Sequence, residues 1–250
     1  MNFSFLCLDD LTHTPVHHCL GTKGLSQTYL DTLLSALLNT VILSVSSLIL
    51  ALVVGILVGT MHTLPPTFFI NRFVRAMARA WVEVTRNAPL LVQIFLYHFV
   101  MPKIYPPALH FPPIFLVVCA LGFFTSTRIA ELMRAGIEAI PSNQRYAALA
   151  MGFTTFQTYG HILIATAFQT IFPALILEFM GIVKNSSVAF AISIHELMQF
   201  QSQTIGEMSH VYENCILVLV LYTLISLAVF AIMRLIETML TVPGFQTEKK

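Results

Sequence analysis

The sequence predicts an all-α protein that crosses a membrane five times. Of its 250 residues, 56% are hydrophobic and 10% are charged, whereas a soluble domain carries about 25% charged residues. Charge is absent from the long stretch 32–71, and a helical span needs about 20 mainly apolar residues. The net charge of +1 argues against nucleic acid as a main partner. An integral membrane protein is therefore the class that this composition favours.

The five spans follow from the apolar segments and from the residues that interrupt them. The first contains Gly55 and Gly59, a small-xxx-small pair that suits close helix contact, and Pro65 ends it. The second is the least regular, because Arg79 and Arg86 precede its apolar half. We expect spans at about 40–61, 76–101, 114–133, 162–183 and 214–234. They make up a transmembrane domain 28–240, flanked by an N-terminal segment 1–27 and a tail 241–250.

The distribution of Lys and Arg predicts the orientation of the chain. With the N-terminus outside, only Lys23, Lys103 and Lys184 of the 13 basic residues fall on the outer side. The other ten fall on or toward the cytoplasm: Arg72, Arg75, Arg79, Arg86, Arg128, Arg134, Arg145, Arg234, Lys249 and Lys250. We therefore expect an outer N-terminus and a cytoplasmic C-terminus.

A polar stretch at 136–152, GIEAIPSNQRYAALAMG, lies on the cytoplasmic side between the third and fourth spans. Pro141 opens it, the small residues Ala147 and Ala148 follow, and Gly152 suits a helix stop. Small residues let another surface approach the backbone closely. The stretch therefore predicts a short helix that a partner can grip, within a loop of about 136–160.

Four sequence blocks resemble bacterial ABC importer permeases for polar amino acids. Residues 144–152, Q-R-Y-A-A-L-A-M-G, look like the EAA loop, and 83–93, E-V-T-R-N-A-P-L-L-V-Q, resemble that family's R-G/N-x-P-L-L-V-Q. Residues 130–141, A-E-L-M-R-A-G-I-E-A-I-P, and 173–187, P-A-L-I-L-E-F-M-G-I-V-K-N-S-S, resemble two further motifs. The blocks occur in the family's order and spacing, so with the spans the resemblance covers about 25–236.

The resemblance implies a type I ABC importer permease fold with a cytoplasmic coupling helix, in a multi-pass protein of the bacterial inner membrane. Such subunits work as pairs, identical or related, on two ATPase subunits, and a periplasmic binding protein supplies the amino acid. The chain itself would then be no enzyme and bind no cofactor, because ATP and Mg²⁺ belong to the ATPase. Asn87, in R-N-A-P, is more like the glutamate/aspartate branch. Membrane lipid is the remaining expected partner.

Three departures from the family pattern keep alternatives open. The glutamate of the EAA loop falls on Tyr146, the proline of a later I-x-L-P on Ala165, and the asparagine before the fourth-span glutamate on Leu177. A transport-dead or regulatory permease-like subunit is therefore one alternative. An intramembrane enzyme is another, although no coherent set of catalytic residues supports it, and no P-loop G-x-x-x-x-G-K-S/T is present.

The resemblance also supplies candidate site residues. Tyr146, Ala147, Ala148 and Gly152 would seat in a cleft of the ATPase. Residues of the substrate pathway would come from three spans and their edges: Arg86, Gln93, Arg128, Glu131, Glu178, Lys184, Asn185 and Ser186. Charge inside a span is expensive and marks function by default.

Structural alternatives compete with each of these roles. Arg128 can bind a substrate carboxylate, but it also stands at i,i+3 from Glu131 and can simply pair with it. Glu178 can meet a substrate ammonium or bond to a neighbouring helix. Arg86 and Gln93 flank a proline turn that can be a gate or a kink, and Lys184 can cap the end of a span.

Cysteine and histidine give weaker signals. Cys7 and Cys19 lie near His13, His17 and His18, so a metal site there is conceivable, but the spacing is irregular and we predict none. His195 and Glu196 form an isolated polar pair, which we expect on a solvated outer helix.

Overall fold

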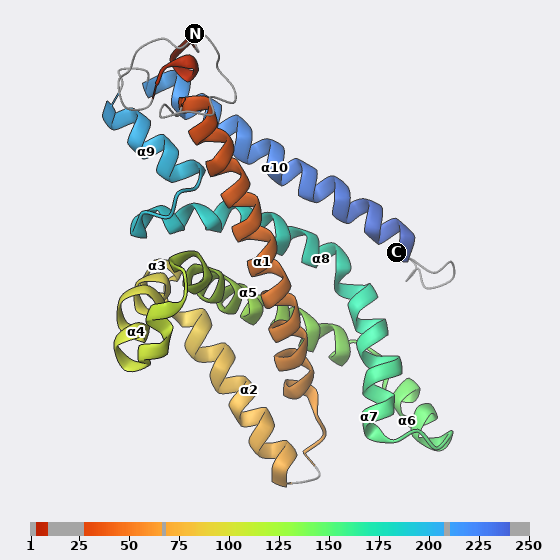
Figure 1. The fold of residues 1–250 in the computed structure, drawn as a ribbon. Helices are drawn as coiled ribbons and strands as arrows, with labels where there is room; N and C mark the ends of the chain where they lie inside the picture. Colours follow the sequence, from red (N-terminus) through yellow and green to blue (C-terminus); the bar gives the residue numbers. More distant parts are fainter. Residues whose placement is uncertain (1–3, 10–27, 67–68, 208–210, 241–250) are drawn as a thin grey trace. The chain divides into compact units, whose positions relative to one another are not determined.

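The computed structural model describes residues 4–9, 28–66, 69–207 and 211–240, and throughout these ranges the regular elements are helices (Figure 1). The four long helices are α1 (Tyr29–Thr63), α5 (Pro113–Glu138), α8 (Ile164–Asn185) and α10 (Val211–Leu240). Shorter α-helices are α2 (Phe69–Asn87), α3 (Leu90–Phe95), α4 (Met101–Ile104), α6 (Ser142–Ala150), α7 (Thr155–Thr158) and α9 (Leu197–Glu207). Two π-helical turns, Leu96–Val100 and Tyr159–Leu163, and three 3₁₀ turns, Ser4–Cys7, Pro106–His110 and Ser186–Ile192, complete the chain.

The chain forms two compact units, and the long helices contribute to both. The first unit comprises residues 1–46, 90–120 and 183–227, and the second comprises 47–89, 121–182 and 228–250. Each unit is therefore described by itself.

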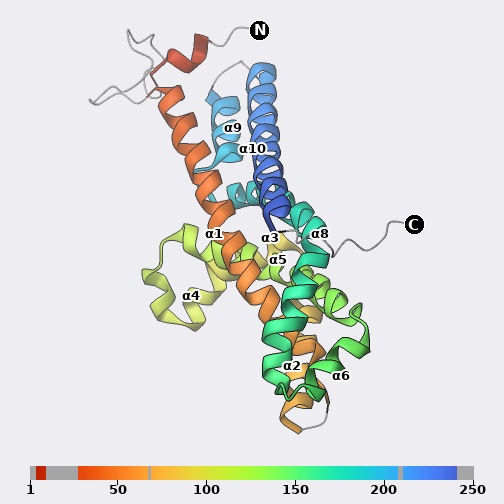
Figure 2. The same ribbon diagram turned by 90° about the vertical axis from the view of Figure 1, so that its right-hand side faces the viewer.

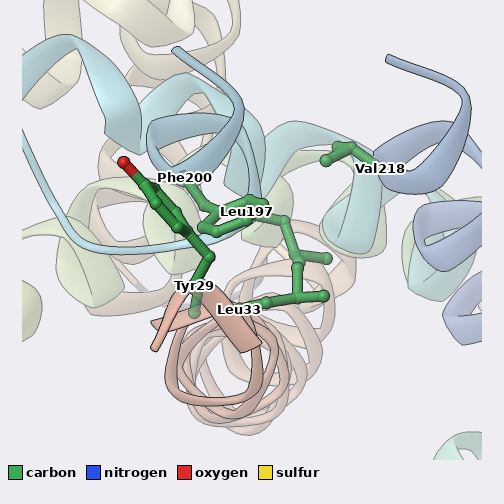
Figure 3. Close-up of a cluster of buried hydrophobic side chains, with 6 residues drawn as sticks. Tyr29, Leu33, Leu197, Phe200 and Val218 are labelled. Atoms are coloured by element: carbon green, nitrogen blue, oxygen red, sulfur yellow. The ribbon is translucent and has the colours of Figure 1, made fainter. Parts of the chain in front are cut away.

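The first unit is built around two buried apolar clusters. In one, Tyr29 and Leu33 of α1 pack against Leu197 and Phe200 of α9 and Val218 of α10 (Figure 3). The other joins α1, α3 and α5 through Leu43, Ile94, Val117 and Ala120, together with Ala189 and Ile194. Burial of such side chains is the main favourable contribution to packing of these helices in the protein interior.

The second unit depends on close approach between helices at glycine. A Cβ atom on Gly59 would lie 2.6 Å from the carbonyl oxygen of Ala130, and one on Gly55 would lie 2.6 Å from the Cβ of Ile129. The end of α1 therefore packs directly on α5, as the small-xxx-small pair predicts. Gly136 gives α5 the same close contact with Ile171 of α8.

Four helical segments are long and apolar enough to cross a membrane: Tyr29–Thr63, Pro113–Glu138, Thr155–Ile192 and Val211–Leu240. The region expected to hold the second span is interrupted, because α2 ends at Asn87 and Pro89 separates it from α3. A shorter apolar helical stretch, Leu90–Ile104, follows this break. The five-span count stays a prediction.

Candidate functional site

The loop between α5 and α8 contains the short helix that the sequence predicts. α6 follows Pro141, whose extended backbone (φ −55°, ψ 132°) precedes the helix. Gly152 has φ +90°, a conformation that side-chain-bearing residues adopt only at a cost. A short helix and a glycine with positive φ therefore occur where the sequence predicts them, while the coupling role of the helix stays a prediction. α6 lies beside α7 (Figure 1), and Figure 2 shows α6 in the turned view.

The outer face of this loop exposes large apolar side chains. Tyr146, Leu149, Met151 and Phe156 are all exposed, and Phe156 retains 87% of its accessible surface. Exposed apolar side chains that gather on one loop are typical of a contact surface. Ala147 and Gly152 are also exposed, but Ala148 is fully buried. The expectation that Ala148 seats in a partner is wrong, because its methyl group already packs inside the unit.

The same loop is attached to the end of α1. The guanidinium of Arg145 lies 5.8 Å from the ring centroid of Tyr159, and the Tyr159 hydroxyl donates a hydrogen bond of 2.7 Å to the Thr63 carbonyl. Thr154 and Gln157 form a capping box that begins α7. Tyr159 therefore contacts both a side chain of α6 and the end of α1.

Charged candidates of the second unit form two ion pairs between segments distant in sequence. Arg86 donates to Glu131 at 2.5 Å and to Glu83 at 3.3 Å, and Arg128 lies 3.5 Å from Glu178. The expected local pair of Arg128 with Glu131 is wrong. Glu131 is taken by Arg86, while Arg128 reaches across to α8 and also lies 5.6 Å from the centre of the Phe124 ring.

These pairs remain accessible within the protomer. The side chain of Arg128 is 54% exposed, and those of Arg86, Glu83 and Glu131 are also exposed. Charged side chains on membrane helices face a protein interior or a water-filled path rather than lipid. The face that carries Arg128 and Glu178 is therefore unsuited to acyl chains.

In the first unit, Lys184 lines a cavity of about 440 Å³ with Ser187, Met198, Gln201 and Tyr222. No acidic side chain among the described residues forms an ion pair with Lys184. Its neighbour Ser186 is buried and its hydroxyl donates to the Val183 carbonyl at 2.7 Å, so it acts as a local cap. Asn185 is half-buried, and Gln93 is buried on α3.

Glu196 is the residue that the sequence interpretation misplaced. It is fully buried rather than solvated, and its carboxylate accepts hydrogen bonds from the amides of Met198 and Gln199, both at 2.9 Å, and from the Tyr222 hydroxyl at 2.6 Å. Burial raises the pKa of this carboxyl, while the three hydrogen bonds oppose the change. The available signal was an acid directly before a helix, where it can cap the first amides.

The adjacent His195 is also held in place. Its ring Nε2 lies 2.9 Å from the Ser35 hydroxyl, its carbonyl accepts from the Asn39 side chain at 2.8 Å, and Thr40 accepts from the Leu197 amide at 3.2 Å. Segment 193–197 therefore joins α1, α9 and α10 through polar contacts. Tyr222 and Gln201, which share the cavity with Lys184, carried no distinguishing pattern in the sequence.

The three departures from the family pattern fall in different surroundings. Tyr146 is exposed on α6 and Leu177 is exposed on α8. Ala165 lines a mainly apolar cavity of about 330 Å³ with Phe168, Phe172 and Glu237.

The described residues contain no group of three His, Cys, Asp or Glu side chains placed to hold a metal ion. Of the conceivable metal ligands near the N-terminus, only Cys7 is described. Cys19, His13, His17 and His18 lie outside the described residues.

Apolar helices long enough to cross a membrane and charged faces unsuited to lipid are typical of a multi-pass membrane transport subunit. Residues 51–242 match the family of binding-protein-dependent transport system inner membrane components, and the chain belongs to that family. It is accordingly a permease subunit of an amino acid ABC importer in the inner membrane, and it is a transport subunit rather than an enzyme.

Two curated relatives illustrate the similarity. The glutamate/aspartate import permease GltJ of Escherichia coli K12 is 33% identical over 188 residues, which cover 70% of this chain and 75% of GltJ. The probable glutamine ABC transporter permease GlnM of Bacillus subtilis 168 is 35% identical over 122 residues, covering 49% of this chain and 55% of GlnM.

Two solved structures are similar in fold. A crystal structure of an amino acid ABC transporter with histidines superposes with a TM-score of 0.71 at 25% identity, covering 84% of this chain and 95% of the other. The inward-facing MetNI methionine ABC transporter gives a TM-score of 0.70 at 20% identity, covering 84% and 97%, and supports the fold alone.

Proposed function

We propose that this subunit carries polar amino acids across the inner membrane, with acidic amino acids favoured, and that Lys184 recognises a substrate carboxylate. The observation that supports this most directly is an ammonium group on the wall of a 440 Å³ cavity that forms no ion pair with any acid of the described residues. That volume lies in the range of small-molecule sites. Gln201, Ser187 and Tyr222 add an amide and two hydroxyls for orientation. The likeness to GltJ, a glutamate/aspartate permease, points the same way.

The second unit has its own candidates for a polar path, the ion pairs Arg86–Glu131 and Arg128–Glu178. Because they are accessible in the protomer, they are suited to face a second permease subunit, identical or related, with a polar path along the contact. Gln93, Asn185 and Ser186 belong to the first unit and do not line its cavity, so we propose no direct contact with substrate for them. Substrate would arrive from a periplasmic binding protein.

The proposed ATPase contact is the exposed cluster of Tyr146, Leu149, Met151 and Phe156, with Ala147 and Gly152 beside it. ATP and Mg²⁺ would bind in the ATPase pair, and closure of that pair would pull on α6. The attachment of Tyr159 to Thr63 would then convert the movement into a tilt of α1, as alternating access requires.

The proposed topology keeps the domain arrangement expected from the sequence. Residues 1–27 form a periplasmic segment, 28–240 form the five-span permease domain, and 241–250 form a cytoplasmic tail. Most of 1–27 and all of 241–250 lie outside the described residues.

The test is ATP hydrolysis by the reconstituted complex of this chain with its ATPase, companion permease and binding protein. Glutamate, aspartate, glutamine, histidine and arginine are added one at a time. Stimulation by glutamate or aspartate is expected, with a half-saturating concentration that rises at least tenfold in Lys184→Met and much less in Lys184→Arg. The exposed outer residue Lys103, changed to Met, serves as the matched control.

Other outcomes separate the alternatives. Stimulation by glutamine or arginine alone would overturn the acidic preference while leaving the importer assignment. A complex that assembles but is stimulated by none of the amino acids would favour the transport-dead subunit. In that case Tyr146→Glu is the first variant to test for restored coupling.

A further inference from the structure

Helix α2 combines an exposed apolar face with a basic stripe. Phe69, Phe73 and Met77 recur at four-residue intervals and are exposed, Phe69 to 85%. Arg72, Arg75 and Arg79 recur at i, i+3 and i+7, so 3.6 residues per turn align them along the adjoining face. Ala78 and Val82 are the buried residues of this helix, and at 100° per residue they adjoin the basic stripe on the side away from the apolar face. Contact with the protein, apolar exposure and positive charge therefore occupy three separate faces.

Two of these arginines lie near the end of α1, close to further basic side chains. Arg75 donates to the Leu64 carbonyl at 3.2 Å, and the Nε of Arg79 lies 3.5 Å from the Nε2 of His62. Arg134 of α5 also lies within electrostatic range of His62. The nearby acid Glu138 is bonded to Arg134 at 2.7 Å, so it offsets one charge of the cluster.

The arginines of this stripe are not all neutralised by acidic side chains of the described residues. Arg72 and Arg79 are both exposed, and neither forms an ion pair with an acid in the part of the chain that the structure describes; Arg79 contacts the His62 ring. Glu83, the acid further along α2, is bonded to Arg86. The stripe therefore offers guanidinium groups to an anion that the protomer does not itself supply.

We propose that Arg72 and Arg79, with Arg75 and Arg134 behind them, bind the phosphate of an anionic phospholipid whose acyl chains lie on Phe69, Phe73 and Met77. Guanidinium groups bind phosphate through paired N–H donors. An amphipathic helix with basic and apolar faces is the usual protein element at the lipid headgroup boundary. The apolar face beside the stripe favours a lipid over a soluble anion, which would need only the charge.

The experiment is native mass spectrometry of the assembled transporter in detergent, titrated with phosphatidylglycerol and, separately, with phosphatidylcholine. We expect phosphatidylglycerol to bind more tightly, and Arg72→Gln and Arg79→Gln each to weaken its binding about fivefold. Arg72→Lys keeps the charge and is expected to retain most of the binding. Lys103→Gln removes one positive charge elsewhere and is expected to change nothing.

Three results would overturn the proposal. The first is unchanged phosphatidylglycerol binding in both arginine variants. The second is displacement of the lipid by inorganic phosphate at equal concentration, which would make this a soluble-anion site. The third is loss of the co-purifying ATPase in Arg72→Gln with lipid binding intact, which would make the stripe a protein contact. Arg72 has no partner within the described chain, so a folding defect in this variant is not expected.

Discussion

Two connecting segments of this molecule differ in which side chains they bury and which they expose. In segment 193–197, before α9, the charged side chain is buried and three donors reach its carboxylate. In the loop that contains α6 and α7, large apolar side chains are exposed and Phe156 is almost fully accessible. The first segment has its polar groups satisfied within the chain, and the second presents a surface suited to another protein. Damage to the first should therefore unfold the subunit, whereas damage to the second should spare folding and weaken assembly.

The largest expected effect is that of Glu196→Leu. The amides of Met198 and Gln199 and the Tyr222 hydroxyl would lose their acceptor inside the protein, at about 1–3 kcal/mol for each unsatisfied group. We expect the free energy of unfolding to fall by about 3–5 kcal/mol, measured by denaturation in detergent.

Glu207→Leu is the matched control for this variant. Glu207 also accepts a tyrosine hydroxyl, that of Tyr29 at 2.7 Å, but it is exposed at the end of α9. Only one hydroxyl, that of buried Tyr29, then loses its acceptor, so the loss should be about 1–2 kcal/mol and smaller than that of Glu196→Leu. Equal destabilisation by the two variants would contradict the view that segment 193–197 is a buried anchor.

A second, smaller effect is expected from Phe156→Asp. The side chain is exposed, so the free energy of unfolding should change by no more than about 0.5 kcal/mol. Affinity for the ATPase should fall at least tenfold, or about 1.4 kcal/mol, because an apolar contact residue is replaced by a charge. Titration of the purified ATPase onto the reconstituted subunit measures this. Tyr212→Asp, at an exposed aromatic residue of α10, should leave the ATPase affinity unchanged. A similar loss of affinity in this variant would mean that the effect of Phe156→Asp is not specific to the loop.

The contrast also explains what the sequence could predict. Local chemistry was enough for α6, because Pro141 and Gly152 mark its two ends, and for the contact of Gly55 and Gly59 with α5. The burial of Ala148 could not be predicted, since the sequence does not distinguish it from the other alanines of α6. Only the positions of the neighbouring helices show which alanine is buried.

The ion pairs of the second unit could not be predicted from local sequence either. Arg128 and Glu131 stand at helical spacing, which predicts a local pair, but each finds a partner more than 40 residues away in sequence. The burial of Glu196 likewise depends on Tyr222, 26 residues further on. Such contacts follow from tertiary packing, which local periodicity does not encode.

A third effect, of about 1 kcal/mol, is expected from Gly152→Ala. No atom lies within 4 Å of the added methyl group, so the destabilisation comes only from the φ of +90°. Gly160→Ala is a matched control, because its surroundings are equally open and its φ is not positive. Thermal unfolding of the subunit in detergent should show a lower midpoint for Gly152→Ala alone. Equal midpoints would mean that the turn after α6 relaxes freely and that Gly152 is no fixed stop.

The smallest effect is the pH dependence that Glu196→Gln should remove. Burial raises the pKa of Glu196 above its ordinary value of 4.5, so between these two values the folded protein holds a proton that the unfolded chain has released. Stability of the natural protein should then fall as pH rises from 4.5 through the raised pKa, and become constant above it. Glutamine keeps one carbonyl acceptor for the surrounding donors but does not titrate. The difference in unfolding midpoint between the two proteins should therefore shift in favour of Glu196→Gln as pH rises. A shift in the opposite direction would mean that the hydrogen bonds from Met198, Gln199 and Tyr222 outweigh burial, and that segment 193–197 holds its carboxylate as a charged cap.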